Sequence, residues 1–483
     1  MRKFFTFSNL TSVIGRISGA LLIPALVFIP ALSAQPPQQP TNSKPEAHAD
    51  TANGPLVQAI ASYQKAIEGS PRNVNLRIEL GLLLARAGRL TEAIASYDQA
   101  LQIAPRSLRA ELGLAQAYRG VHNYSEAQRI LERACREHPK SAAPLSVLGD
   151  LDLELETYDP AIKHLTAAIA LAPGDVGARD RLAGAYKSKG DEAKALEEVE
   201  KALARDPKDA LAYFLRGQIL FDRNEDEAAL RDARKAIEIQ PQNRESQMLL
   251  AKILLKIPQN AAPDETKQRC ANAASVLEPL AEAPTKNSEV LFLLSRAYRC
   301  AGERDLAQKT VPDLEAALKG EQALRENRMQ AKHLVEQAKN LAMKNDFPGA
   351  LDLLQEAQAR DPSYSFTYSQ LAKIYYSVGE LEKSSKAISQ AIERDPYQPD
   401  SLYVQGKILE RQEKPDEAMA VFKKVVVINP RESDAYFEIG AICQQRNDRA
   451  CALAAYKKAA ELSPDDPDYK KALEAFSKSS PPR

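Results

Sequence analysis

The chain has 483 residues, and its 65 basic and 65 acidic side chains cancel to a formal net charge of zero. A cancelled charge excludes a global field that would attract nucleic acid or an anionic membrane surface, so we expect no nucleic-acid partner. Tryptophan is absent, and no long run of Val, Ile and Thr alternates with polar residues as strands would require. The composition therefore predicts an all-α chain.

The first 33 residues have the features of a secretory signal peptide. Arg2 and Lys3 precede an apolar stretch at 19–30, and the small residues Ala31 and Ser33 occupy the two positions expected before a cleavage site. We therefore expect a periplasmic or secreted product with no membrane span once the signal is removed.

An uncleaved N-terminal anchor is the alternative. The apolar stretch from Ile17 to Ala34 is close to the lower length for crossing a bilayer. Pro24 and Pro30 argue against a spanning helix. A lipid anchor is not expected either, because Gln35 stands where a bacterial lipobox requires cysteine.

Residues 34–54 are rich in Pro, Gln and Ala and contain almost no large apolar side chain. Such a segment cannot bury enough surface to offset the entropy of ordering the chain. It is predicted to be a disordered linker.

Prolines divide the rest of the chain at a constant interval of 34 residues. When each proline is counted as position 32 of a repeat, small residues recur at positions 8, 20 and 27. The prolines are Pro71, Pro105, Pro139, Pro173, Pro207 and Pro241, then Pro362, Pro396, Pro430 and Pro464. This regularity predicts a tandem array of one structural unit.

A 34-residue period with these small positions resembles the tetratricopeptide-repeat (TPR) family. The resemblance implies a superhelical solenoid of antiparallel helix pairs, in which a large residue at position 24, such as Tyr97 or Phe422, fills the groove beside the small ones. About eleven repeats are expected, starting at Val74, Leu108, Ala142, Val176, Ala210, Arg244, Ser288, Ala331, Ser365, Pro399 and Ser433. Partial matches at 55–70 and 468–476 are expected to cap the array.

The period is regular at 55–243 and at 331–466, and it breaks between them. Residues 257–267 look like an insertion, and the charged stretch near 320–329 looks like a helix extension. We therefore expect an N-terminal regular array at 55–243, irregular repeats at 244–330, a C-terminal regular array at 331–466, and a capping helix and tail at 467–483.

Residues for catalysis or metal binding do not cluster in the sequence. The five histidines are scattered over the linker, a turn, a helix end and two helices in different repeats. The sequence contains no phosphate-binding loop, dinucleotide fingerprint, nucleophile elbow or zinc-protease motif. We expect no catalytic residues, no cofactor, no metal and no enzymatic activity.

Four of the five cysteines are placed so that they could form disulfides. Cys443 and Cys451 lie at the same end of one predicted hairpin, and Cys270 and Cys300 lie at adjacent ends of two antiparallel helices. The alternative is that each thiol is a small buried apolar group. Cys135 would remain single.

The family resemblance also predicts where a ligand would bind. In such proteins ligands lie along the concave face of the first helices, where positions 2, 5, 9, 12 and 13 point inward. The carboxylate clamp of co-chaperones is not matched by any three consecutive repeats.

Position 9 is basic in five consecutive repeats, and we call these residues the basic row: Lys252, Arg296, Lys339, Lys373 and Lys407. Aromatic residues at other inward positions, among them Phe292, Tyr376 and Tyr403, would add side-chain pockets. The alternative is ordinary charge beside acidic neighbours and ordinary packing at the edge of the core.

The sequence thus favours a non-catalytic protein–protein interaction scaffold or adaptor of the bacterial cell envelope, which binds a partner protein or peptide along the concave groove. The alternative is a helper in exopolysaccharide assembly or secretion that binds an anionic polysaccharide.

Overall fold

The computed structural model describes residues 50–258 and 261–478. The predicted signal peptide and residues 34–49 of the predicted linker lie outside this part of the chain. The described residues form 23 α-helices and no strand, which confirms the predicted all-α class.

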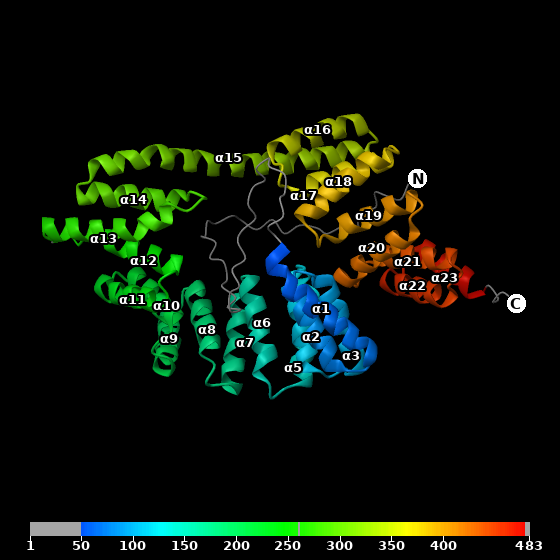
Figure 1. The fold of residues 1–483 in the computed structure, drawn as a ribbon, viewed down its shortest axis with the longest axis horizontal. Coiled ribbons are helices and arrows are strands. Elements are labelled where there is room, and N and C mark those ends of the chain that lie inside the picture. The colour runs from blue at the N-terminus through cyan, green and yellow to red at the C-terminus, as the bar shows by residue number, and fades with distance from the viewer. Residues whose placement is uncertain (1–49, 259–260, 479–483) are drawn as a thin grey trace. The chain divides into compact units, whose positions relative to one another are not determined.

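The described residues fall into two compact units, with boundaries inside α5 and α15. Unit 1 is made of residues 50–130 and 325–478. Its complete helices are α1 (Asp50–Gly69), α2 (Val74–Arg86), α3 (Leu90–Ile103), α4 (Leu108–Gly120), α16 (Phe347–Arg360), α17 (Ser365–Ser377), α18 (Leu381–Arg394), α19 (Pro399–Arg411), α20 (Pro415–Ile428), α21 (Ser433–Gln445), α22 (Arg449–Leu462) and α23 (Pro467–Lys478) (Figure 1).

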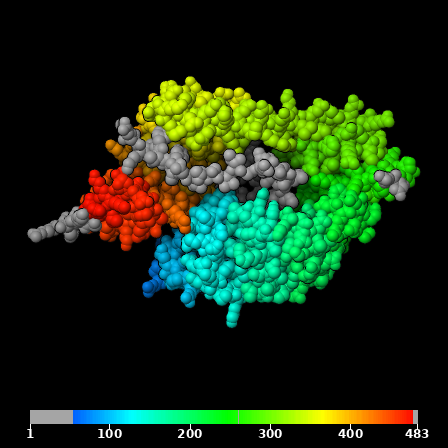
Figure 2. Space-filling view, turned by 180° about the vertical axis from the view of Figure 1, so that it is seen from behind, coloured from blue at the N-terminus to red at the C-terminus, as the bar shows by residue number. Residues whose placement is uncertain are grey.

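Unit 2 comprises the described residues from 131 to 324. In the space-filling view its neighbouring hairpins, coloured cyan to green, lie in close contact (Figure 2). Its complete helices are α6 (Ala142–Glu154), α7 (Tyr158–Leu171), α8 (Val176–Lys189), α9 (Glu192–Arg205), α10 (Ala210–Asp222), α11 (Asp226–Ile239), α12 (Arg244–Leu255), α13 (Pro263–Ala281) and α14 (Ser288–Ala301). The helices that cross the boundaries are α5 (Tyr124–Glu137) and α15 (Arg304–Met343).

Each hairpin is held by the large-into-small packing that the period predicts. A Cβ atom added to Gly406 would lie 2.5 Å from the Phe422 ring, and one added to Gly81 would lie 2.7 Å from the Tyr97 ring. The alanines at positions 20 and 27 are fully or almost fully buried, for example Ala418 at 0% exposure. The two helices of a hairpin can therefore approach only because these positions lack bulk.

The turn between repeats has a local explanation in the sequence. The repeated proline follows the end of a second helix, and in several repeats a polar side chain two residues later caps the next first helix. Asn73 accepts a hydrogen bond from the Leu76 amide, and Asp175 accepts one from the Ala178 amide. Proline therefore ends one repeat, and the cap starts the next.

The irregular middle of the array follows the predicted insertions. The helix extension is confirmed, because α15 is one continuous helix of 40 residues that supplies the second helix of repeat seven and the first helix of repeat eight. The extra residues after α12 form the connection to α13, which has 19 residues. All eleven predicted hairpins are present in the described residues between α2 and α22.

The two ends of the array differ slightly from expectation. The predicted caps correspond to α1 and α23, but α1 begins at Asp50, so residues 50–54 of the predicted linker are helical. The predicted array boundaries after 243 and 330 mark breaks in the period, whereas the compact units divide elsewhere, so that partition stays a prediction.

Among the described residues, none of the helices has the combination of length and apolar character needed to cross a membrane.

Candidate partner-binding surface

The basic row lies on first helices, as the repeat register requires. Lys252 and Arg296 belong to α12 and α14 of unit 2. Lys339, Lys373 and Lys407 belong to the C-terminal part of α15, to α17 and to α19 of unit 1. Each unit therefore has its own part of the row, and we consider the two parts separately.

In unit 2 both basic side chains have partners within the chain. Lys252 Nζ forms an ion pair with Glu289 of α14 at 2.7 Å. Arg296 Nη2 donates a hydrogen bond to the Leu255 carbonyl at 3.0 Å, at the end of α12. These contacts link neighbouring first helices, and both side chains also serve to join one repeat to the next.

In unit 1 the three lysines are paired to different degrees. Lys407 Nζ lies 2.6 Å from Glu410 and 2.9 Å from Glu438. Lys339 Nζ lies 2.8 Å from Glu336, and Lys373 Nζ lies 3.9 Å from Asp400. The alternative expectation, that acidic neighbours within the chain pair with the basic row, therefore holds for these three lysines to different degrees.

Lys373 is the least compensated member of the row in unit 1. Burial lowers the pKa of its ammonium group, and the positive charge of Lys339 acts in the same direction, while Asp400 opposes the shift. At Lys407, burial also disfavours the charge, but Glu438 and Glu410 outweigh it and raise the pKa. A desolvated cation with a distant partner gains the most from an added anion.

A buried amide lies on the same helix as Lys373. Gln370 is 7% exposed, and its Nε2 atom has no hydrogen-bond acceptor among the described residues. A buried donor without an acceptor is costly, so Gln370 is a local cost in the packing of α17. The sequence alone did not single out Gln370.

Of the three aromatic residues predicted to line the groove, one is open to solvent. Phe292 is 50% exposed on α14. Tyr376 is 6% exposed and lies under the Arg411 guanidinium, 4.1 Å from the ring centroid. Tyr403 donates a hydrogen bond to Glu438 at 3.1 Å, and burial raises the pKa of its hydroxyl. Tyr376 and Tyr403 thus contribute to packing in the present structure.

The structure brings both predicted cysteine pairs together. Cys270 at α13 is bonded to Cys300 at α14, with 5.7 Å between their Cα atoms. Cys443 and Cys451 are bonded across one hairpin, with 5.8 Å between their Cα atoms. Cys135 is a free thiol. Both bonds would fasten helices that already pack against each other.

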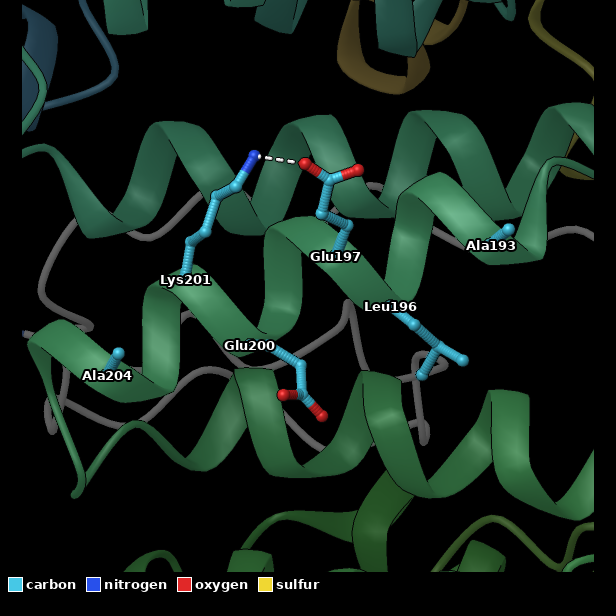
Figure 3. A pocket seen from close by; sticks show the side chains of 6 residues that line it. All are labelled: Ala193, Leu196, Glu197, Glu200, Lys201 and Ala204. Atoms are coloured by element: carbon cyan, nitrogen blue, oxygen red, sulfur yellow. Dashed lines mark hydrogen bonds and ion pairs between the residues drawn. The ribbon is translucent and has the colours of Figure 1, made fainter.

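A shallow hollow also occurs on the second helix α9 (Figure 3). It is lined by Ala193, Leu196, Glu197, Glu200, Lys201 and Ala204. These residues come from one helix, and Lys201 forms ion pairs there with Glu197 and Glu198. The hollow therefore has the character of a solvated helix surface.

The sequence did not predict one pair of carboxyl groups in unit 2. Asp180 of α8 and Asp209, which precedes α10, face each other at hydrogen-bonding distance. The available signal was the pair of glycines at inward positions around Asp180, namely Gly177 and Gly184.

Comparison with known proteins agrees with this architecture. Family models described as tetratricopeptide repeat match residues 47–107, 84–151, 152–219, 210–243, 369–433 and 433–466. These matches together span more than half of the chain. The chain belongs to the tetratricopeptide-repeat family.

One curated TPR relative is the Hsp70-Hsp90 organizing protein 1 of Glycine max. It is 27% identical over 152 residues, which make up 31% of this chain and 27% of the relative. The chain thus matches well under two thirds of that relative's length.

Solved structures of TPR proteins are also similar in part. YrrB, described as a TPR protein with an unusual peptide-binding site, is 28% identical; the match covers 38% of this chain and 95% of that chain, with a TM-score of 0.32. Pseudomonas aeruginosa pilF is 20% identical; the match covers 49% of this chain and 96% of that chain, with a TM-score of 0.39. Similarities at these TM-scores do not extend to the curvature of the array or to its ligands.

Proposed function

We propose that the protein is a non-catalytic interaction scaffold that binds a partner protein or peptide along the concave face of its first helices. The partner is expected to present acidic side chains or backbone carbonyl groups to Lys339 and Lys373 of unit 1. The observation that carries this proposal is Lys373 on α17, a desolvated cation whose nearest anion, Asp400, lies 3.9 Å away.

A protein partner fits this surface better than a long anionic polysaccharide does. A polyanion would gain most from a continuous row of free cations. Lys252, Lys339 and Lys407 instead lie within 2.9 Å of carboxylates. Local positive charge of this kind suits a few acidic groups of one protein segment.

The cell envelope is the proposed location, and it rests on the signal-like residues 1–33. Sequencing the N-terminus of the mature protein should find a chain that begins after Ser33. An intact N-terminus starting at Met1 in a soluble cell fraction would contradict export.

The concave face can be tested by crosslinking in intact cells of the source organism. The full chain would carry a benzophenone amino acid at Phe366, whose ring lies 5.9 Å from Lys339 Nζ, or at Leu453, which is 37% exposed on the second helix α22. A discrete crosslinked partner is expected for the Phe366 position and not for the Leu453 position. Crosslinks from Leu453 alone would overturn the concave-face assignment.

The role of the lysines is best tested with neutral substitutions, because replacing Lys407 with an acidic residue would place three carboxylates together. Lys339→Met with Lys373→Met should reduce the Phe366 crosslink about 10-fold, because each lost ion pair weakens binding by roughly 0.5–1 kcal/mol. The matched control is Lys383→Met with Lys386→Met, on the second helix α18, where both lysines are exposed. An undiminished crosslink in the Lys339/Lys373 variant would remove these lysines from the binding surface.

A further inference from the structure

The Asp180–Asp209 pair lies on first helices of unit 2, away from the lysines discussed above. Asp180 occupies inward position 5 of α8 and is only 5% exposed. Its Oδ1 atom is buried and has no hydrogen-bond donor among the described residues, and the same holds for Asp209 Oδ2. Two carboxyl groups in this situation cannot both be ionised unless a cation lies beside them, so in its absence one of them holds a proton.

The groups that could compensate the pair are committed elsewhere. Arg181 forms an ion pair with Asp150 at 2.6 Å and donates to Ser146 Oγ at 2.6 Å. Asp209 uses its Oδ1 atom to accept from the Leu211 and Ala212 amides, where it caps α10. One buried oxygen of each residue in the pair is thereby left without a donor.

Glycines surround Asp180 on the inward side of α8. Gly177 and Gly184 occupy inward positions 2 and 9 of the same repeat. A Cβ atom at Gly184 would have no neighbour within 4 Å. The inner face of α8 therefore has open space one turn beyond Asp180.

We propose that the Asp180–Asp209 pair is a recognition subsite for a lysine ammonium group of a partner segment lying along the concave face of α8 and α10. The proposal rests on the proposed scaffold function, but it uses residues outside the basic row. A lysine fits because its long methylene stem carries a compact charge with three donors to a recessed site. A divalent cation fits poorly, because Ca²⁺ needs six to eight oxygen ligands and the pair offers the two free oxygens.

In the free protein a proton occupies the place of the ligand. Burial raises the pKa of the Asp180 carboxyl to about 9, and Asp209 and Asp175 raise it further while Arg181 opposes them. Binding an ammonium ion at neutral pH therefore displaces the Asp180 proton to the buffer. As long as the pH is below that pKa, the apparent affinity for the ammonium group should rise about 10-fold for each unit by which the pH increases.

The test uses the full chain and a blocked pentapeptide, acetyl-Gly-Gly-Lys-Gly-Gly-amide, with the norleucine peptide as its neutral match. Carboxyl ¹³C signals of labelled aspartates would be followed during titration at pH 6, 7 and 8, and Asp180→Asn would assign the pair. The lysine peptide should shift the Asp180 and Asp209 signals. Its affinity should increase about 10-fold for each unit by which the pH is raised from 6 to 8. Calorimetry in two buffers should show the release of one proton per bound peptide.

Specificity is checked with variants that leave the fold intact. Asp180→Asn should abolish these shifts, whereas Asp222→Asn, at an exposed carboxylate of α10, should leave them unchanged. Equal shifts with the norleucine peptide, or persistence of binding in Asp180→Asn, would overturn the subsite. An Asp180 carboxyl signal that shifts with pH but not on addition of the lysine peptide would also overturn the subsite. Because Lys339 and Lys373 are not involved, loss of the proposed acidic-partner site would leave this result unaffected.

Discussion

The two units differ in whether a buried charge on their first helices is compensated by a group of opposite charge. In unit 1, Lys407 is enclosed by Glu410 and Glu438, so its charge is satisfied within the chain. In unit 2, Asp180 faces another carboxyl group, and neighbouring Arg181 is engaged by Asp150. A satisfied buried charge mainly fixes the packing of repeats, whereas an unsatisfied one makes stability depend on a proton or a ligand.

The largest expected effect comes from Asp180→Asn. The folded pKa of about 9 lies above the usual unfolded value of about 4, so the folded chain holds a proton that the unfolded chain releases. The stability that this proton provides is fully present below about pH 4 and is lost as pH rises toward 9. Asn cannot ionise, so at pH 8, about four units above the unfolded pKa, the variant should gain on the order of 5 kcal/mol, most of what the full shift would give.

Hydrogen exchange of the α8 and α10 amides in the full chain, at pH 5 and pH 8, would measure this gain. Asp222→Asn serves as the control, because that carboxylate is 54% exposed. Equal protection of wild type and Asp180→Asn at pH 8 would show that the pair carries no buried-charge cost.

The disulfides provide the next comparison between the units. Reducing Cys270–Cys300 of unit 2, which closes 30 residues, should destabilise its helices by about 3.5 kcal/mol. Reducing Cys443–Cys451 of unit 1, which closes 8 residues, should cost about 2.5 kcal/mol, because the smaller loop restricts the unfolded chain less. The measurement is the melting temperature of each double Cys→Ser variant.

Mass mapping under non-reducing conditions provides the control for this comparison. It should find Cys135 alone as a free thiol. Five free thiols in protein isolated from its native compartment would eliminate both bonds.

Two glycine substitutions give the smallest expected effects, with opposite signs. Gly406→Ala in unit 1 would press a methyl group into the fully buried Phe422 ring, at a cost of about 2 kcal/mol. Gly184→Ala in unit 2 meets open space and should stabilise α8 by about 0.5–1 kcal/mol through better helix propensity. Thermal unfolding followed by circular dichroism would show a lower melting temperature for Gly406→Ala and a higher one for Gly184→Ala. Equal changes in melting temperature would contradict the packing role of position 8.

The sequence by itself determined the repeat architecture. Proline at position 32 and small residues at positions 8, 20 and 27 act within one hairpin or between adjacent hairpins. Their effect can therefore be predicted from the sequence. The charged residues near 320–329 also predicted a helix extension, whereas the structure showed that this extension joins two repeats in the single helix α15.

Only the tertiary structure decided which inward-facing side chains have partners. Lys407 meets Glu438 from the following repeat, Tyr376 lies under Arg411, and Asp180 faces the residue that caps α10. These contacts depend on how far one repeat rotates against the next and on the side-chain conformations adopted there. The 34-residue period fixes that a position faces inward, but not what it meets.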